Sequence, residues 1–255
     1  MTTQAPYGGQ SETQGKRMPK TGFVVTAHPG DFVWRAGGAI ALHAKRGWRV
    51  KILCLSFGER GESQFAWKDP NATLESVKAA RKAEAEAAAA VLGAEIEFMD
   101  AGDYPLVTTP AMMDRAIDLF RELNPAWVLT HSLNDPYNLD HPEATRFAQA
   151  ARIVAQAMGH KPGPGYSYAA PPVFLFEPHQ PEQCGFQPNV ILNIDEAWET
   201  KRKAFECLPA QKHLWAYYER VALNRGMQGG RNSGKAMVYG EAYQRLFPMI
   251  MDELA

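Results

Sequence analysis

Short apolar runs alternate with longer amphipathic segments along most of this chain. The apolar runs have the length and side chains of buried β-strands, and they occur at residues 22–27, 49–57, 95–100, 127–131, 172–176 and 190–194. Segments with helical spacing fall between the first five runs, at residues 34–46, 72–92, 110–122 and 142–158. Strands that alternate with helices of this length are typical of βαβ units. The pattern therefore predicts an α/β fold, a single-domain, Rossmann-like three-layer arrangement with a mostly parallel sheet.

The N-terminal end differs from the rest of the chain. Residues 1–20 are polar and lack the apolar core of a signal peptide, so we expect a flexible tail. The Pro- and Gly-rich stretch 162–172 has the composition of a loop between the fourth helix and the fifth strand. A chain of 255 residues is long enough for one large domain with a sizeable core. We therefore expect one catalytic domain over residues 21–255.

The net charge and the cysteines bear on the partners and the cellular compartment of the protein. The formal net charge is −1, which gives no basic surface for nucleic-acid binding. Cys54, Cys184 and Cys207 are scattered without CxxC spacing, as in proteins of a reducing cytoplasm. No apolar run reaches the roughly 18 residues of a membrane span. We expect a cytoplasmic protein without nucleic-acid or membrane partners, and the oligomeric state, a homo-oligomer included, stays open.

The first apolar run ends in a pattern that carries chemistry. His28 and Asp31 follow it in the sequence His-Pro-x-Asp, which places an imidazole and a carboxylate three residues apart on one tight turn. Zinc takes nitrogen and oxygen ligands of these types. The pattern is weak when it stands alone, and the structural alternative is that His28 bonds the backbone of its own turn.

Further polar side chains follow the later apolar runs. They are Glu59, Arg60 and Glu62 after the second run, Asp103 after the third, His131, Asp135, Asn138 and His141 after the fourth, and Glu177 and His179 after the fifth. In an open parallel sheet, ligands bind at the carboxyl ends of the strands, where these loops gather. Structural alternatives exist, since His141 could cap the following helix and His131 could lie in the core. The clustering nevertheless predicts an active site at this edge.

The segment from Thr26 to Phe32 resembles the Ala-His-Pro-Asp-Asp-Glu motif of the LmbE-like (PIG-L) zinc deacetylases. The later Asp-His pair and the Gly-Glu-x-Gly at 58–61 extend the resemblance in order and spacing from about residue 22 to 180. The resemblance implies that His28, Asp31 and His141 bind Zn²⁺.

Two departures from this family concern its catalytic groups. Gly30 stands where the family has its general-base aspartate, and Asn138 stands where it has a histidine that assists the oxyanion. Phe32 also replaces a glutamate of the motif. The metal ligands are kept while the deacetylase machinery is lost, which indicates a reaction other than deacetylation.

Longer segments resemble one branch of the family, the 4-oxalomesaconate hydratases of bacterial gallate and protocatechuate breakdown. These segments are residues 32–43, 55–63, 135–142, 176–184, 211–218 and 220–225. The resemblance implies the addition of water to a double bond that is conjugated to a ketone and flanked by carboxylates. Zinc can serve such a reaction by lowering the pKa of bound water toward ~7, or by holding enolate oxygens as a Lewis acid.

The expected site combines a metal, proton-transfer groups and cations for a small tricarboxylate substrate. We expect Zn²⁺ on His28, Asp31 and His141, catalysis by Glu62, His179 and Glu59, and substrate binding by Arg81, Arg35, Arg60, Asn138 and His131. Arg81 is the first choice among the arginines, because Arg81-x-x-Glu84 matches a substrate-holding arginine of the family. The alternatives are an LmbE-like N-deacetylase or amidase and a catalytically silent protein that binds metal or carboxylates.

Overall fold

The computed structural model describes residues 19–160 and 170–253. Residues 1–18 of the expected tail and residues 162–169 of the expected Pro/Gly-rich loop lie outside the described residues. The domain boundary at residue 21 therefore stays a prediction.

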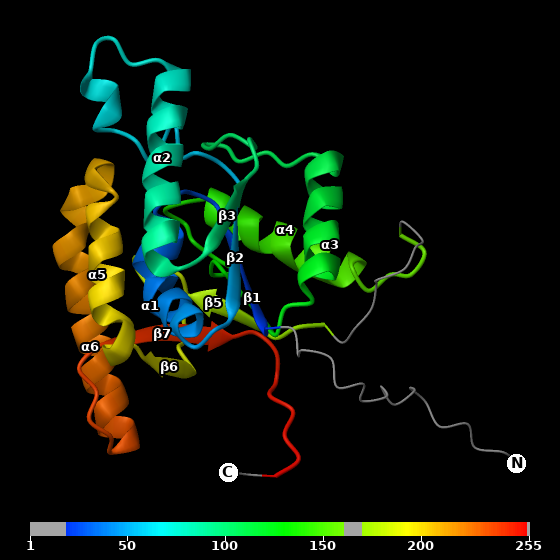
Figure 1. Ribbon diagram of the computed structural model, residues 1–255, viewed down its shortest axis with the longest axis vertical. Helices are drawn as coiled ribbons and strands as arrows, with labels where there is room; N and C mark the ends of the chain where they lie inside the picture. The colour runs from blue at the N-terminus through cyan, green and yellow to red at the C-terminus, as the bar shows by residue number, and fades with distance from the viewer. Residues whose placement is uncertain (1–18, 161–169, 254–255) are drawn as a thin grey trace, which may run out of the picture.

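A seven-stranded sheet runs through the centre of the molecule in the order β3-β2-β1-β4-β5-β7-β6 (Figure 1). The strands are β1 (Thr21–Thr26), β2 (Arg49–Cys54), β3 (Glu95–Phe98), β4 (Trp127–Thr130), β5 (Val173–Phe176), β6 (Val190–Asn193) and β7 (Gly240–Arg245). The first five are parallel to one another, whereas β7 is antiparallel to both β5 and β6. The mostly parallel α/β fold is confirmed.

Helices cover both faces of the sheet and give three layers (Figure 1). They are α1 (Asp31–Lys45), α2 (Leu74–Leu92), α3 (Pro110–Leu123), α4 (Asp140–Val154), α5 (Trp198–Glu206) and α6 (Trp215–Ser233), with 3₁₀ turns at Ala66–Lys68, Asp195–Ala197 and Pro209–Leu214. Helices α1, α2 and α5 pack against one another on one face, where α6 contacts β6 and β7, and α3 packs against α4 on the other face.

Alternating side chains of the central strands pack into two separate hydrophobic cores, one on each face of the sheet. In β1, Val24 joins the core beneath α1 and α2, while Phe23 and Val25 join the core beneath α3 and α4. Successive side chains of a strand point to opposite faces, so a strand that is covered on both faces is apolar throughout. This explains why the central strands appear in the sequence as unbroken apolar runs.

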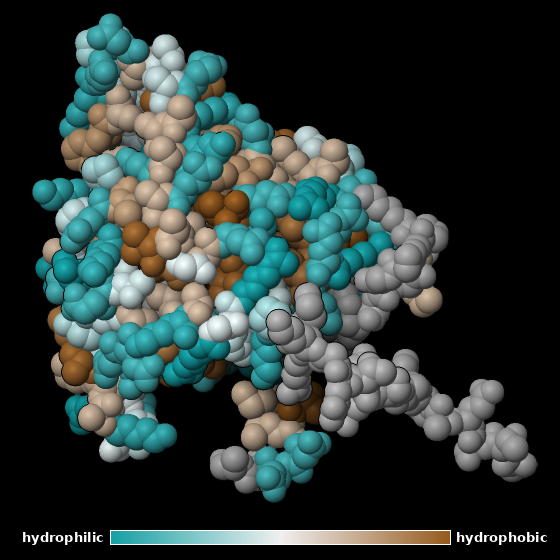
Figure 2. Space-filling model, viewed as in Figure 1, coloured by the Kyte–Doolittle hydropathy of each residue, from teal (hydrophilic) through white to brown (hydrophobic). Residues whose placement is uncertain are grey.

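Hydrophilic residues are spread over much of the face that carries α2 and α3 (Figure 2). Within residues 19–160 and 170–253, no helix has both the length and the apolar character needed to cross a membrane.

The connections from β1 to α1 and from β4 to α4 place the first turns of both helices at the carboxyl edge of the sheet. Helix α1 begins at Asp31, directly after β1, and α4 begins at Asp140, ten residues after β4 ends at Thr130. Both helices start earlier than the apolar spacing predicts, by three and two residues, and each begins at an aspartate, Asp31 in α1 and Asp140 in α4. The first turns of α1 and α4 therefore supply side chains to the same edge of the sheet.

Candidate active site

His28, Asp31 and His141 converge at the carboxyl ends of β1 and β4. Their nitrogen and oxygen ligand atoms all lie within 4.8 Å of one another, and all three residues are buried. His28 lies on the turn after β1, and Asp31 and His141 lie in the first turns of α1 and α4. The three residues that sequence analysis chose as metal ligands are thus brought together.

Carboxylates on the far side of both imidazoles fix which nitrogen faces the site. Nε2 of His28 lies 3.1 Å from Oδ2 of Asp140, which leaves Nδ1 facing Asp31 at 3.2 Å. Nδ1 of His141 lies 2.8 Å from Oδ2 of Asp135, and its Nε2 has no hydrogen-bond partner. A carboxylate behind a histidine is the usual support of a metal-binding imidazole, because it holds the ring orientation and the tautomer.

The charges around these residues favour a cation. Burial acts against protonation of His28, but the hydrogen bonds with Asp140 and Asp31 and the nearby Glu62 raise its pKa to about 10. Burial also acts against ionisation of Asp31, yet the neighbouring imidazoles of His141 and His131 hold the pKa of that carboxyl well below its usual range. A divalent metal ion would satisfy this negative surrounding in place of a proton.

The donor set therefore fits a metal ion. Two imidazole nitrogens and a carboxylate oxygen form a three-ligand set of the kind found in catalytic sites with an open position. The unpartnered Nε2 of His141 is the clearest sign, because a buried polar atom without a partner is costly unless something binds it.

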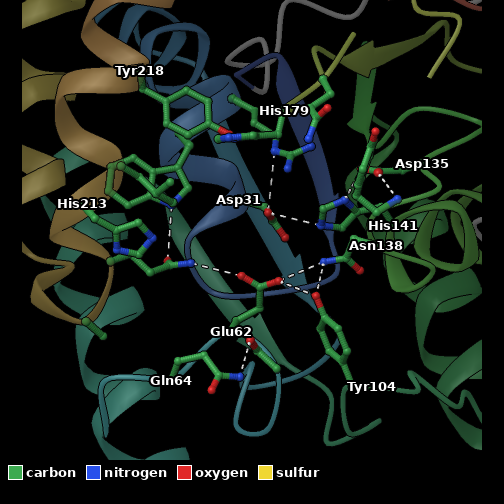
Figure 3. Close-up of a pocket in the computed structure, with 18 of the residues that line it drawn as sticks. Asp31, Glu62, Gln64, Tyr104, Asp135, Asn138, His141, His179, His213 and Tyr218 are labelled. Atoms are coloured by element: carbon green, nitrogen blue, oxygen red, sulfur yellow. Dashed lines mark hydrogen bonds and ion pairs between the residues drawn. The ribbon is translucent and has the colours of Figure 1, made fainter. Parts of the chain in front are cut away.

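Glu62 extends from the loop after β2 to the edge of this group. Its Oε1 accepts hydrogen bonds from Nδ2 of Asn138 at 2.9 Å and from Oη of Tyr104 at 3.1 Å (Figure 3). Its Oε2 accepts from Nε2 of Gln211 at 3.2 Å. Oε1 lies 4.0 Å from Nδ1 of His28, so this carboxylate sits beside the candidate metal position.

An open cavity of about 370 Å³ lies beside the three candidate metal ligands, and Asp31 and His141 line it. The Arg35 side chain lines it and is only 6% exposed, yet Nε and Nη1 have no hydrogen-bond partner. The nearest carboxylate oxygen to this group, Oδ1 of Asp31, lies 3.7 Å from Nε, which is too long for a hydrogen bond. A buried guanidinium with unused donors is a site for an anionic group of a ligand.

His179 and Glu62 face the cavity from opposite sides of Asp31 (Figure 3). The His179 ring stacks on Tyr217, with 4.1 Å between ring centroids. Burial and the charge of Arg35 lower the pKa of His179 from its usual value, so the imidazole is neutral at pH 7 and able to accept a proton.

Five of the expected site residues do not line the cavity, and one of them is the candidate ligand His28. His131 is fully buried behind the candidate metal ligands, where Nε2 accepts from the backbone N–H of Ala27 at 3.0 Å. Glu59 is fully buried, and Arg60 bonds the backbone oxygen of Asp103 at 2.8 Å. Arg81 is 1% exposed and bonds Glu84 and Gln211.

These placements change the expectation for Arg81. Its guanidinium lies behind Gln211 rather than on the cavity wall, because α2 packs against α5 and α1. Among the three candidate arginines, Arg35 is the one that lines the cavity. Direct contact between Arg81 and a substrate does not agree with this burial.

Sequence reasoning missed several residues that complete the site. Asp140 directly precedes His141, and Tyr104 follows Asp103, so both lie at strand ends where they could have been found. Gln211 and Tyr218 lie in the C-terminal part of the chain, beyond the alternating strands and helices, and the only signal that included them was the resemblance of segment 211–218 to the hydratases.

Comparison with known proteins places this geometry in a family. Residues 23–152 match the PIG-L family, described as GlcNAc-PI de-N-acetylase. The chain is 49% identical to the 4-oxalmesaconate hydratase of Pseudomonas putida, and the alignment covers all of both chains. The protein belongs to the PIG-L family. The match contains all three candidate metal ligands.

Two solved structures share the fold of this chain but differ widely in sequence identity to it. The crystal structure of GalB, the 4-carboxy-2-hydroxymuconate hydratase of Pseudomonas putida, has a TM-score of 0.90 and 52% identity, and the alignment covers 92% of this chain and all of GalB. The N,N'-diacetylchitobiose deacetylase of Pyrococcus horikoshii has a TM-score of 0.73 but only 22% identity, with 90% and 85% of the two chains covered. The second likeness shows the shared fold alone.

Proposed function

We propose that this PIG-L protein is a zinc-dependent hydro-lyase that adds water to the conjugated double bond of 4-oxalomesaconate and yields 4-carboxy-4-hydroxy-2-oxoadipate. The observation that carries the proposal is full-length identity of 49% to a protein named 4-oxalmesaconate hydratase. The match to GalB, a protein named as a hydratase, supports the same reaction class. In this reading the protein acts in the breakdown of gallate and protocatechuate.

His28, Asp31 and His141 would hold the zinc ion, and Asp140 and Asp135 would hold the two imidazoles in place. When bound, the ion would supply Lewis acidity to a water molecule or to the substrate's oxygens. Zinc is the proposed metal because it accepts this nitrogen and oxygen donor set with an open position.

Arg35 is the proposed anchor for a substrate carboxylate. Arg35 lines a cavity whose other charged lining groups include the carboxylates of Asp31, Glu62 and Asp135, and its buried Nε and Nη1 have no hydrogen-bond partner. A trianionic substrate needs a compensating cation inside such a cavity, and a guanidinium binds a carboxylate through two parallel hydrogen bonds.

Glu62 and His179 are the proposed proton-transfer pair. One removes a proton from water as the water oxygen bonds to the carbon that will carry the hydroxyl group. The π electrons of the double bond then move toward the ketone and form an enolate, and the other group delivers a proton to the neighbouring carbon. The placement of the two residues on opposite sides of Asp31 supports this division (Figure 3).

We also propose a cytoplasmic location. The three cysteines, Cys54, Cys184 and Cys207, are free, which is in keeping with a reducing compartment.

A paired assay tests the proposed function. Purified zinc-loaded protein is mixed with 4-oxalomesaconate, and the loss of the conjugated chromophore is followed in parallel with acetate release from N-acetylglucosamine. We expect rapid loss of the chromophore and no acetate. Acetate release without hydration would favour an N-deacetylase, which the family description suggests. Absence of both activities in metal-loaded protein would favour a silent binding protein.

A further inference from the structure

The corner of the cavity beside Gly30 is filled by a side chain from the far end of the sequence. A Cβ at position 30 would lie 2.2 Å from Oε1 of Gln211 and 2.6 Å from Nε1 of Trp34. Gly30 has φ −85° and ψ −26°, a conformation that any residue adopts. Glycine is therefore required at this position for space and not for backbone freedom.

The orientation of the Gln211 carboxamide is fixed by its neighbours. Oε1 lies 3.0 Å from Nη2 of Arg81 and 3.3 Å from Nε1 of Trp34, and both of these groups are donors only. The carbonyl oxygen must therefore face them, and the NH₂ group must face Oε2 of Glu62, 3.2 Å away. Reversing the amide would break all three hydrogen bonds.

Arg81 is itself held in one position. Its side chain is 1% exposed and forms an ion pair with Glu84 one turn along α2. A buried guanidinium that is already paired moves little, so it makes a rigid support for the carboxamide. This role also accounts for the burial of Arg81 behind the cavity wall.

The three donors to Glu62 come from different parts of the chain. Asn138 and Tyr104 donate to Oε1, and Gln211 donates to the other oxygen, Oε2. With Oε1 alone held, the carboxylate could still rotate about the bond to its chain. The hydrogen bond from Gln211 removes that freedom and leaves Oε1 beside His28.

We propose that Gln211 is a positioning residue for Glu62, that Gly30 provides the room for its carboxamide, and that Arg81 sets the direction of that carboxamide. The inference rests on the proposed function, because Glu62 is the proton-transfer group that it positions. It also bears on specificity. A side chain at position 30 and the carboxamide of Gln211 cannot occupy this corner together, so the corner holds a neutral donor and has no room for a second acid beside the metal.

The first test replaces Gln211 by methionine, which has similar length but no amide. Because a proton-transfer group misplaced by about 1 Å can cost on the order of 10²-fold in rate, we expect kcat to fall by about 10- to 100-fold. KM should stay within about threefold and zinc content should be unchanged, because Gln211 holds neither Arg35 nor the metal ligands. Gln156→Met, at a glutamine outside the cavity lining just after α4, is the matched control. Unchanged kcat in Gln211→Met would overturn the proposal.

A second variant keeps the test valid if Gln211→Met does not fold. Gln211→Glu keeps the acceptor for Arg81 and Trp34 but turns an acceptor toward Glu62, so kcat should again fall. Rescue of kcat by this variant, or loss of zinc in both variants, would overturn the positioning role.

A double-mutant cycle, followed by thermal unfolding, tests the contact between position 30 and Gln211 without any substrate. Gly30→Ala, Gln211→Ala and the double variant are compared by the midpoint of thermal unfolding. Gly30→Ala should lower the midpoint by less in the Gln211→Ala background, because only the Trp34 contact then remains. Additive shifts would refute the contact. This readout holds even if the protein lacks hydratase activity, so failure of the proposed function and failure of the inference are distinguishable.

Discussion

Arg35 offers the sharpest test of how the cavity binds a substrate. Its side chain is 6% exposed, it lines the cavity, and its Nε and Nη1 atoms have no hydrogen-bond partner. Arg35→Ala removes the guanidinium and with it the proposed carboxylate anchor. Arg35→Lys keeps a positive charge but replaces the planar pair of donors by one compact ammonium group.

The expected magnitude follows from the number of hydrogen bonds at stake. A hydrogen bond to a charged group contributes about 1.5–3 kcal/mol. At 1.36 kcal/mol per factor of ten, the loss of one such bond raises KM by about 10- to 150-fold. Two donors are free, so Arg35→Ala should reach the upper part of this range, and Arg35→Lys should lie between the wild type and Arg35→Ala.

The assay is steady-state hydration of 4-oxalomesaconate with zinc content measured on each preparation. Zinc must be checked because Nε of Arg35 lies 3.7 Å from the candidate ligand Asp31. Arg146→Ala, on the exposed side of α4, controls for the loss of a surface arginine whose partner is Glu143. A KM within threefold of the wild type in fully zinc-loaded Arg35→Ala would refute the anchor.

The remaining predictions concern the metal and the proton-transfer groups. His28→Ala and His141→Ala should each lose zinc by metal analysis, and full occupancy in both would contradict the ligand assignment. Gly30→Asp should lower hydratase activity, because the new side chain overlaps the carboxamide that fills this corner and adds a negative charge near an anionic substrate; a gain in activity would contradict this. Glu62→Gln and His179→Ala should each lower kcat by ~10²–10⁴-fold with zinc retained, and near-normal kcat in both would exclude the proposed pair.

The fold was predictable as far as the regular alternation extends. Helix α2 illustrates this, since Thr73 caps its start and Gly93 ends it with φ 76°, as the glycine at that point predicts. The apolar runs predicted strands β1 to β6. The signal is clearest for the central strands, because helices cover both of their faces. Strand β7 was missed because its sequence, Gly-Glu-Ala-Tyr-Gln-Arg, is mostly polar. Its buried Glu241 is satisfied by Lys201 at 2.7 Å, a contact between residues 40 positions apart.

Strand-end reasoning predicted an active site at this edge, and the family resemblance selected His28, Asp31 and His141, which the structure brings together as a candidate metal site. The sequence did not predict in the same way whether a side chain on a helix reaches the cavity or stays buried behind it. Whether Arg81 reaches the cavity depends on Gln211, which is 130 residues further along the chain. A helix periodicity tells which face is buried, but not which distant side chain lies between that face and the cavity.

The candidate metal ligands and one of the two proposed proton-transfer groups lie in different parts of the sequence. The family match ends at residue 152 and so includes the three candidate metal ligands and Glu62. His179 and Gln211 lie beyond it, and Gln211 contacts Glu62 across 149 positions. Membership in the PIG-L family therefore accounts for a metal site, while the side chains that we propose for proton transfer and its positioning come partly from the C-terminal region. A match over residues 23–152 alone does not include the side chain that fills the corner beside Gly30, because that side chain is Gln211.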